Sequence, residues 1–277
     1  MKYMWAVVVV LCLTATGVWA QSGLVTARAT GMGGAGIGVA DDAAAWFQNP
    51  AGLAALHVPV QEGKIWGTDA VGTLASLDVG PSTRDAWGVN VSGWQPAEGI
   101  GLGGGFSHTN DVGDVIGAGF GTAVKRMPLT GGISLVHMNP ATGDSSTLVN
   151  LGGMWRFEQP ERGPIRLGVT VEDIFDDIGN GATLNAGVAW PVTNELLFAA
   201  DATDLTGRMA DGPFFNAGAE LKPVSVAGLA LRAGVTDTGD KHAFTAGAGY
   251  VVRNWRFDAA FADLEDGLWS FSAGVHF

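Results

Sequence analysis

Apolar residues alternate with polar or small residues along the end of the chain, residues 269–277 of the segment 268–277. The apolar positions are Trp269, Phe271, Ala273, Val275 and Phe277, and the positions between them are Ser270, Ser272, Gly274 and His276. Successive side chains of a strand point to opposite faces, so this period of two gives one apolar and one polar face. The segment is therefore predicted to be a strand between an apolar and a polar environment.

Thirteen earlier segments repeat this pattern, and turn residues separate them. They are 71–79, 84–94, 98–107, 113–124, 129–138, 147–157, 164–173, 182–190, 194–204, 213–221, 226–235, 242–251 and 254–263. Most are long enough to cross a bilayer at a steep tilt, and bacterial single-chain barrels have even strand numbers. We therefore predict an all-β fold, a transmembrane antiparallel up-and-down β-barrel of about 14 strands over residues 58–277. Residues 58–67 are interpreted as the approach to the wall, and whether they add a strand stays open.

The turns and the tryptophans agree with a membrane barrel. If the carboxyl terminus is periplasmic, the turns on that side are short and mostly contain proline, and the outer turns are longer and more acidic. Five tryptophans fall on the apolar face near strand ends, as in aromatic girdles: Trp87, Trp155, Trp190, Trp255 and Trp269. The alternative is a soluble β-sandwich, which would expose charged residues. Here the polar face carries mostly Gly, Ala, Ser, Thr and Asn, which favours the barrel.

The amino terminus has the layout of a secretory signal peptide over residues 1–20. Lys2 precedes an apolar stretch at residues 6–13, and Ala20 ends a cleavage site. The apolar stretch is too short for a spanning helix. We expect export through the inner membrane, cleavage near Ala20 and residence in the bacterial outer membrane. The only cysteine, Cys12, lies in this segment, so the cleaved chain would hold neither a disulfide nor a thiol.

Composition and charge narrow the range of functions. The 277 residues carry a net charge of −12, which argues against binding nucleic acid, because phosphates need basic partners. The histidines lack metal-ligand spacing, and no Ser–His pair shares a strand face within hydrogen-bonding reach. The G-x-G-x-x-G match at residues 31–36 follows no buried strand, so it does not indicate a nucleotide site. We expect a non-enzymatic protein with no catalytic residues, no metal and no cofactor.

Charged residues are few on the inward face, and they form one candidate group. The predicted lumen charges are Arg166, Glu172, Arg232, Arg256 and Asp258, and Arg156, Asp201 and Glu220 lie on the same face. Such residues could line a path for ligands or ions, or they could pair with one another and keep the lumen polar and the barrel rigid. We prefer the paired network.

Residues 21–57 differ from the rest of the chain, because glycine and alanine replace the alternating pattern. We interpret them as a hatch inside the lumen, where small inward residues of the wall leave room. Asp41 or Asp42 would cap a short helix over residues 43–47, and Pro50 would help to end it. The candidate residues of the hatch or ligand path are Gly31, Gly33, Gly34, Asp41, Asp42, Asn49 and Pro50.

The stretch at residues 27–56 resembles the amino-terminal signature of the FadL/PorV/TraF group of outer-membrane proteins. Three blocks carry the resemblance: GMGGA at 31–35, DDA at 41–43 and NPAGL at 49–53. The resemblance implies a hatch inside a fourteen-stranded barrel and transport of hydrophobic molecules such as long-chain fatty acids. The terminal Phe277 resembles the signal by which the barrel-insertion machinery recognises outer-membrane barrels. The chain is shorter than a typical FadL transporter, which favours the PorV- or TraF-like members.

Two functions follow as hypotheses. The first is passive transport of small hydrophobic molecules across the outer membrane. The alternative is a non-transporting interaction or structural protein that serves secretion or surface attachment. The expected partners are outer-membrane lipid, the barrel-insertion machinery, and either hydrophobic small molecules or a secretion partner.

Overall fold

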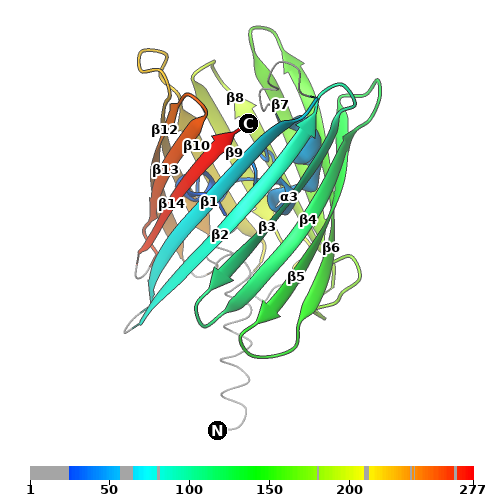
Figure 1. Ribbon diagram of the computed structural model, residues 1–277, viewed down its shortest axis with the longest axis vertical. Helices are drawn as coiled ribbons and strands as arrows, with labels where there is room; N and C mark the ends of the chain where they lie inside the picture. Colours follow the sequence, from blue (N-terminus) through cyan, green and yellow to red (C-terminus); the bar gives the residue numbers. More distant parts are fainter. Residues whose placement is uncertain are drawn as a thin grey trace.

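The computed structural model describes residues 25–56, 65–79, 82–179, 181–208, 212–237, 239, 241–264 and 267–277. In these residues fourteen antiparallel strands close into a barrel (Figure 1). The strands are β1 (Gly67–Val79), β2 (Ser82–Gln95), β3 (Ile100–Thr109), β4 (Gly113–Ala123), β5 (Leu129–Pro140), β6 (Ser146–Gln159), β7 (Arg162–Glu172), β8 (Thr183–Pro191), β9 (Leu196–Thr203), β10 (Phe214–Leu221), β11 (Leu229–Asp237), β12 (His242–Val252), β13 (Trp255–Ala262) and β14 (Leu268–His276). The predicted fold class is confirmed. The predicted signal peptide, residues 1–20, lies outside the described residues.

The last strand closes the barrel on the first. β14 pairs with β1 in a continuous register from Asp69 opposite His276 to Leu77 opposite Leu268. Beyond β14, the backbone N–H of Phe277 donates to the carbonyl oxygen of Thr68 at 2.9 Å. Closure removes the unpaired edges that an open sheet would leave. β1 begins before the predicted position 71, and residues 58–64 of the predicted approach lie outside the described part of the chain.

The two faces of the wall have the predicted polarity. Large apolar side chains point outward all round the barrel, and the five girdle tryptophans are 38–52% exposed. The inward face is polar and buried, with Asn90, Ser107 and Thr170 among many such residues. An apolar surface that encircles a molecule needs an apolar solvent, and a closed barrel satisfies its backbone hydrogen bonds within the wall. The wall is therefore that of a transmembrane barrel.

The turns divide into two groups by the strand that they follow. We call the turns after odd-numbered strands the odd-side rim, and the turns after even-numbered strands the even-side rim, where the carboxyl terminus lies (Figure 1). The longest connections, residues 173–182 and 204–213, both belong to the odd-side rim. The predicted difference in length between the two sides is present.

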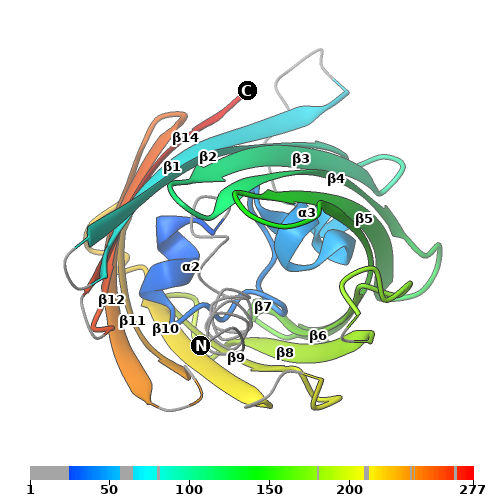
Figure 2. The same ribbon diagram turned by 90° about the horizontal axis from the view of Figure 1, so that it is seen from below.

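The segment before the wall lies inside the barrel (Figure 2). We call its described residues, 25–56, the hatch. It contains the helices α2 (Ala27–Gly31) and α3 (Ala45–Gln48) and the 3-10 helix η1 (Pro50–Ala55). None of the helices in the described ranges is long and apolar enough to cross a membrane.

The helices of the hatch begin at other residues than predicted. α3 starts at Ala45, and its N-cap is Ala44, which makes no side-chain cap. Asp42 instead accepts a hydrogen bond from the backbone N–H of Ala44 at 2.9 Å, before the helix begins. Pro50 opens η1, because its missing N–H is harmless in a first helical turn. Neither predicted aspartate therefore caps α3.

Candidate functional site

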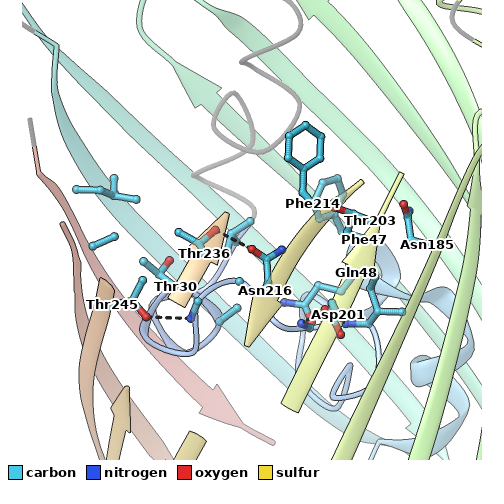
Figure 3. A pocket seen from close by; sticks show the side chains of 18 of the residues that line it. Thr30, Phe47, Gln48, Asn185, Asp201, Thr203, Phe214, Asn216, Thr236 and Thr245 are labelled. Carbon is cyan, nitrogen blue, oxygen red and sulfur yellow. Dashed lines mark hydrogen bonds between the residues drawn. The ribbon is translucent and has the colours of Figure 1, made fainter. Parts of the chain in front are cut away.

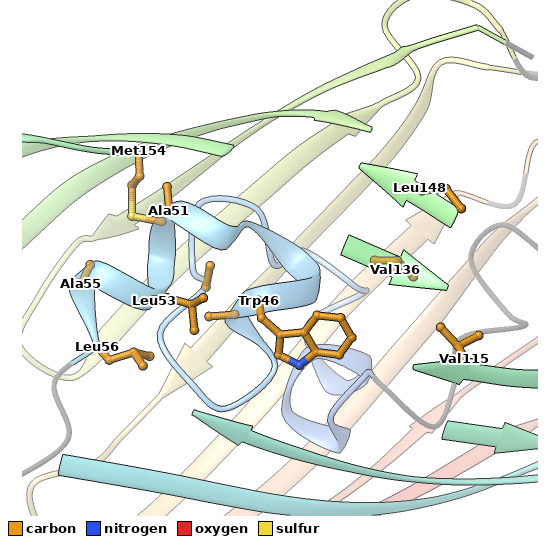
Figure 4. Packing of buried hydrophobic residues seen from close by; sticks show 11 residues of the cluster. Trp46, Ala51, Leu53, Ala55, Leu56, Val115, Val136, Leu148 and Met154 are labelled. Carbon is orange, nitrogen blue, oxygen red and sulfur yellow. The ribbon is translucent and has the colours of Figure 1, made fainter. Parts of the chain in front are cut away.

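One end of the hatch is fixed by an apolar cluster against β3 to β6 (Figure 4). Trp46 is fully buried there, and its indole N–H donates to Asn90 Oδ1 on β2 at 3.0 Å. Leu53 of η1 is also fully buried, and Val136 and Met154 belong to the same cluster from the wall. A tryptophan with a satisfied N–H and an enclosed ring holds α3 in one orientation.

Glycines of the wall allow the hatch backbone to approach it closely. A methyl group at Gly132 would lie 2.3 Å from the carbonyl carbon of Pro50, and one at Gly218 would lie 2.3 Å from the carbonyl oxygen of Met32. Other inward glycines lie in the same relation to hatch atoms: Gly101, Gly103, Gly105, Gly117, Gly119, Gly121, Gly152, Gly168, Gly187, Gly234 and Gly247. They lie on strands from β3 round to β12. The wall is therefore shaped to hold this segment, since a Cβ at these positions would displace it.

The candidate glycines of the hatch have different surroundings. Gly33 has φ +69°, and its N–H donates to Thr245 Oγ1 on β12 at 3.0 Å. The same hydroxyl donates to the carbonyl oxygen of Gly31 at 3.1 Å. Gly34 has φ +81° and nothing within 4 Å of the place where a Cβ would stand, so it borders open space.

Asn49 joins three segments through one buried side chain. Its amide nitrogen donates to the carbonyl oxygens of Ile37 and of Gly153 on β6, at 3.0 and 3.2 Å. Its Oδ1 accepts the N–H of Ala51 at 3.1 Å and so caps η1. Pro50 follows as the first residue of that helix. These two candidate residues hold the hatch to the wall, and neither borders the cavity described below.

Asp41 and Arg28 connect the hatch electrostatically to the wall. Arg28 pairs with Asp41 in the hatch and with Glu220 on β10, the latter at 2.9 Å. Arg166 on β7 reaches Asp41 from the other side at 3.1 Å. Burial disfavours the charged form of Asp41, but Arg28 and Arg166 outweigh it and hold the pKa of that carboxyl well below its usual range. In contrast, burial raises the pKa of the neighbouring Asp42.

The ion pairs continue along the wall on the far side of Glu220. Arg232 lies between Glu220 and Asp258, at 2.8 Å from each, and Arg256 reaches Asp258 at 3.2 Å. Asp69 on β1 lies 3.9 Å from Arg256 and accepts the backbone N–H of Ala43 in the hatch at 3.0 Å. The lumen therefore holds a chain of paired charges from β7, through the hatch, to β13 and β1.

Four of the five predicted lumen charges belong to this chain: Arg166, Arg232, Arg256 and Asp258. Glu172 does not; its Oε1 accepts a hydrogen bond from Asn185 Nδ2 at 2.9 Å. Sequence reasoning missed Arg28 and Asp69. Arg28 is the only lysine or arginine in residues 21–57, a segment that also holds Asp41 and Asp42, and this is the signal that could have identified it. No comparable signal marks Asp69, whose role depends on the barrel closure.

A cavity of about 170 Å³ lies between the hatch and the odd-side ends of β7 to β14 and of β1, and we call it the lumen cavity (Figure 3). Its apolar lining includes Val25, Ile37, Phe47 and Phe214. Its polar lining includes Gln48, Glu172, Asn185, Asp201, Thr203 and Asn216. Asp201 Oδ2 accepts the backbone N–H groups of Gly36 and Ile37 at 2.6 and 2.9 Å, which ties the hatch to the cavity wall. Of the candidate glycines, Gly33 and Gly34 both line this cavity.

A closed fourteen-stranded wall, an apolar exterior, a polar lumen and an inserted segment together define the class of outer-membrane β-barrels. Within the described residues, His, Cys, Asp and Glu side chains form no group that could hold a metal ion.

Comparison with known proteins supports this class at the level of fold. No family model matches the sequence, and no curated protein matches it. Among solved structures, the deltaS2 mutant of the monoaromatic hydrocarbon channel TodX superposes with a TM-score of 0.56 at 15% identity, over 92% of this chain and 98% of that one. The outer-membrane protein Omp33 of Acinetobacter baumannii gives a TM-score of 0.55 at 12% identity, over 76% of this chain and 98% of that one. Similarities at this level of identity concern the fold alone.

Proposed function

We propose that this protein is an outer-membrane channel for the passive passage of small hydrophobic molecules. The observation that carries the proposal is the lumen cavity, which combines aromatic and aliphatic side chains with a few polar groups. Binding sites for small molecules generally have this composition. A barrel filled only for rigidity would have no need of an apolar space beside a polar wall.

Two further observations support the proposal. The amino-terminal blocks resemble the FadL/PorV/TraF group, in which the hatch accompanies transport of hydrophobic molecules. The fold is also similar to that of TodX, which is described as a monoaromatic hydrocarbon channel. We therefore assign small, uncharged aromatic molecules as the first substrates to test.

The competing proposal is a barrel that serves as a docking or structural protein in secretion or surface attachment. The close seating of the hatch on wall glycines and ion pairs favours it, because such a hatch is firmly held. The two proposals differ in whether the lumen cavity is used.

The test is uptake of radiolabelled ethylbenzene into proteoliposomes or cells. Thr203 lines the lumen cavity on β9, whereas Ala200 on the same strand is exposed on the outer face. We expect Thr203→Trp to fill the cavity and lower uptake about tenfold. Ala200→Trp is the matched control, and it should keep the uptake of the unmodified protein. Equal uptake by both variants and the unmodified protein would favour the docking proposal.

A further inference from the structure

The lumen cavity has an unusual balance of charge. Two carboxylates line it, Glu172 and Asp201, and no lysine or arginine is among its lining residues in the described part of the chain. The arginines Arg28, Arg166, Arg232 and Arg256 are engaged in the chain of ion pairs described above. The charge compensation that holds the hatch therefore does not extend into the cavity.

Neither carboxylate is neutralised by its own contacts. Glu172 is only partly buried, and its one hydrogen bond comes from the neutral amide of Asn185. Asp201 is 5% exposed and binds two backbone N–H groups through Oδ2, while Oδ1 has no hydrogen-bond partner among the described residues. A buried carboxylate oxygen without a partner is costly, so a donor supplied by a ligand would be favourable there.

The turns on the side of the lumen cavity carry an excess of negative charge, the same sign as its two carboxylates. The turns of the odd-side rim carry many acidic residues, among them Asp144, Asp173, Asp177 and Asp263, whereas their bases are Arg208 and Lys241. The turns of the even-side rim carry acids and bases in similar number. A cleft surrounded by charge of one sign concentrates ligands of the opposite sign and repels others.

We infer that the lumen cavity prefers small aromatic or aliphatic molecules that carry a protonated amine over those that carry a carboxylate. Phe47 and Phe214 would contact the apolar body of the ligand, and Glu172 with Asp201 would accept hydrogen bonds from the ammonium group. This inference rests on the proposed function and specifies the substrate class of the same site. It disfavours fatty-acid anions as the main substrates.

Binding of three probes of similar size to the folded protein in nanodiscs tests the inference: 2-phenylethylamine, 3-phenylpropionate and ethylbenzene. We expect 2-phenylethylamine to bind at least about tenfold more tightly than 3-phenylpropionate. Glu172→Gln keeps an acceptor for Asn185 and removes the charge. It should therefore weaken the binding of 2-phenylethylamine and leave the binding of ethylbenzene unchanged. The control is Glu98→Gln, which removes the same charge from an exposed residue of the even-side rim.

The outcomes separate this inference from the proposed function. Ethylbenzene binding without a preference for the amine over the carboxylate would overturn the inference and leave the channel proposal standing. An amine preference that Glu172→Gln leaves undiminished, in a variant with unchanged heat-modifiable gel mobility, would also overturn it. Failure of all three probes to bind would contradict the proposed function and the inference together.

Discussion

At the scale of single residues, the fit between hatch and wall depends on which face a glycine occupies. Gly152 and Gly153 are neighbours on β6 and point to opposite faces. A methyl group at Gly152 would lie 2.3 Å from Asn49 Oδ1 and 3.0 Å from the backbone nitrogen of Ala51. A methyl group at Gly153 would meet nothing within 4 Å. The same substitution should therefore have opposite consequences at adjacent positions.

We predict that Gly152→Ala destabilises the folded barrel by about 1–3 kcal/mol, because Asn49 caps η1 and cannot move without breaking its hydrogen bonds. Urea titration in lipid vesicles, read by heat-modifiable mobility, measures the free energy of unfolding. Gly153→Ala should change it by less than about 0.5 kcal/mol. A similar loss in both variants would show that strand propensity, and not contact with the hatch, decides the effect.

The sequence predicts much at this scale and misses a definite part. The period of two correctly assigns Trp87 and Phe271 to the outer face and Arg232 to the lumen, because the side chains of a strand point alternately to its two faces. It does not say which inward glycines touch the hatch. Those contacts depend on how β6 and η1 lie in space, and no local pattern records that arrangement.

At the scale of elements, the hatch is held to the wall through charge as well as packing. Arg28 at α2 and Arg232 on β11 share Glu220 on β10, whose side chain is 1% exposed. Lys222 approaches the same carboxylate at 2.8 Å. Glu220 therefore balances three cations, and its removal would leave two buried guanidinium groups with fewer partners.

We predict that Glu220→Gln lowers the free energy of unfolding by about 3 kcal/mol and makes the hatch accessible to protease. Glu158→Gln is the control, because Glu158 is 73% exposed and lies 3.7 Å from Arg156. An exposed ion pair of this kind contributes about 0–1 kcal/mol to the free energy of unfolding. Equal stability of the two variants would contradict a structural role for the buried chain of charges.

The wall and the hatch differ in how well sequence predicts them. Every strand of the wall repeats the same alternation, so fourteen weak signals support one another and the closure of β14 on β1 follows. The hatch has no such repetition. Two hydrogen bonds fix the backbone just before α3, which starts at Ala45. Asp42 accepts the N–H of Ala44, and Asp69 of the wall accepts the N–H of Ala43. Tertiary contacts of this kind override local capping preferences.

At the scale of the whole molecule, the barrel combines an apolar exterior, a firmly seated hatch and a cavity on the side of the odd-side rim. The exterior accounts for residence in a bilayer, and the chain of ion pairs accounts for the preferred interpretation of the lumen charges. The lumen cavity could not be predicted, because its lining comes from strands far apart in the sequence and from three separate parts of the hatch. Glu172 is an example. The alternation along its strand predicts that its charge faces inward, but it does not predict that the side chain lacks a cationic partner among the described residues.

If small apolar molecules occupy the lumen cavity, they should protect a single cysteine placed there from modification. The only cysteine of the chain lies in the predicted signal peptide, so Thr203→Cys would give one reporter in the cavity and Ala200→Cys one on the outer face. The measurement is the rate of modification by methyl methanethiosulfonate in nanodiscs, with and without ethylbenzene. We predict that ethylbenzene slows modification at position 203 and leaves the rate at position 200 unchanged. Equal rates at position 203 with and without ethylbenzene would contradict it.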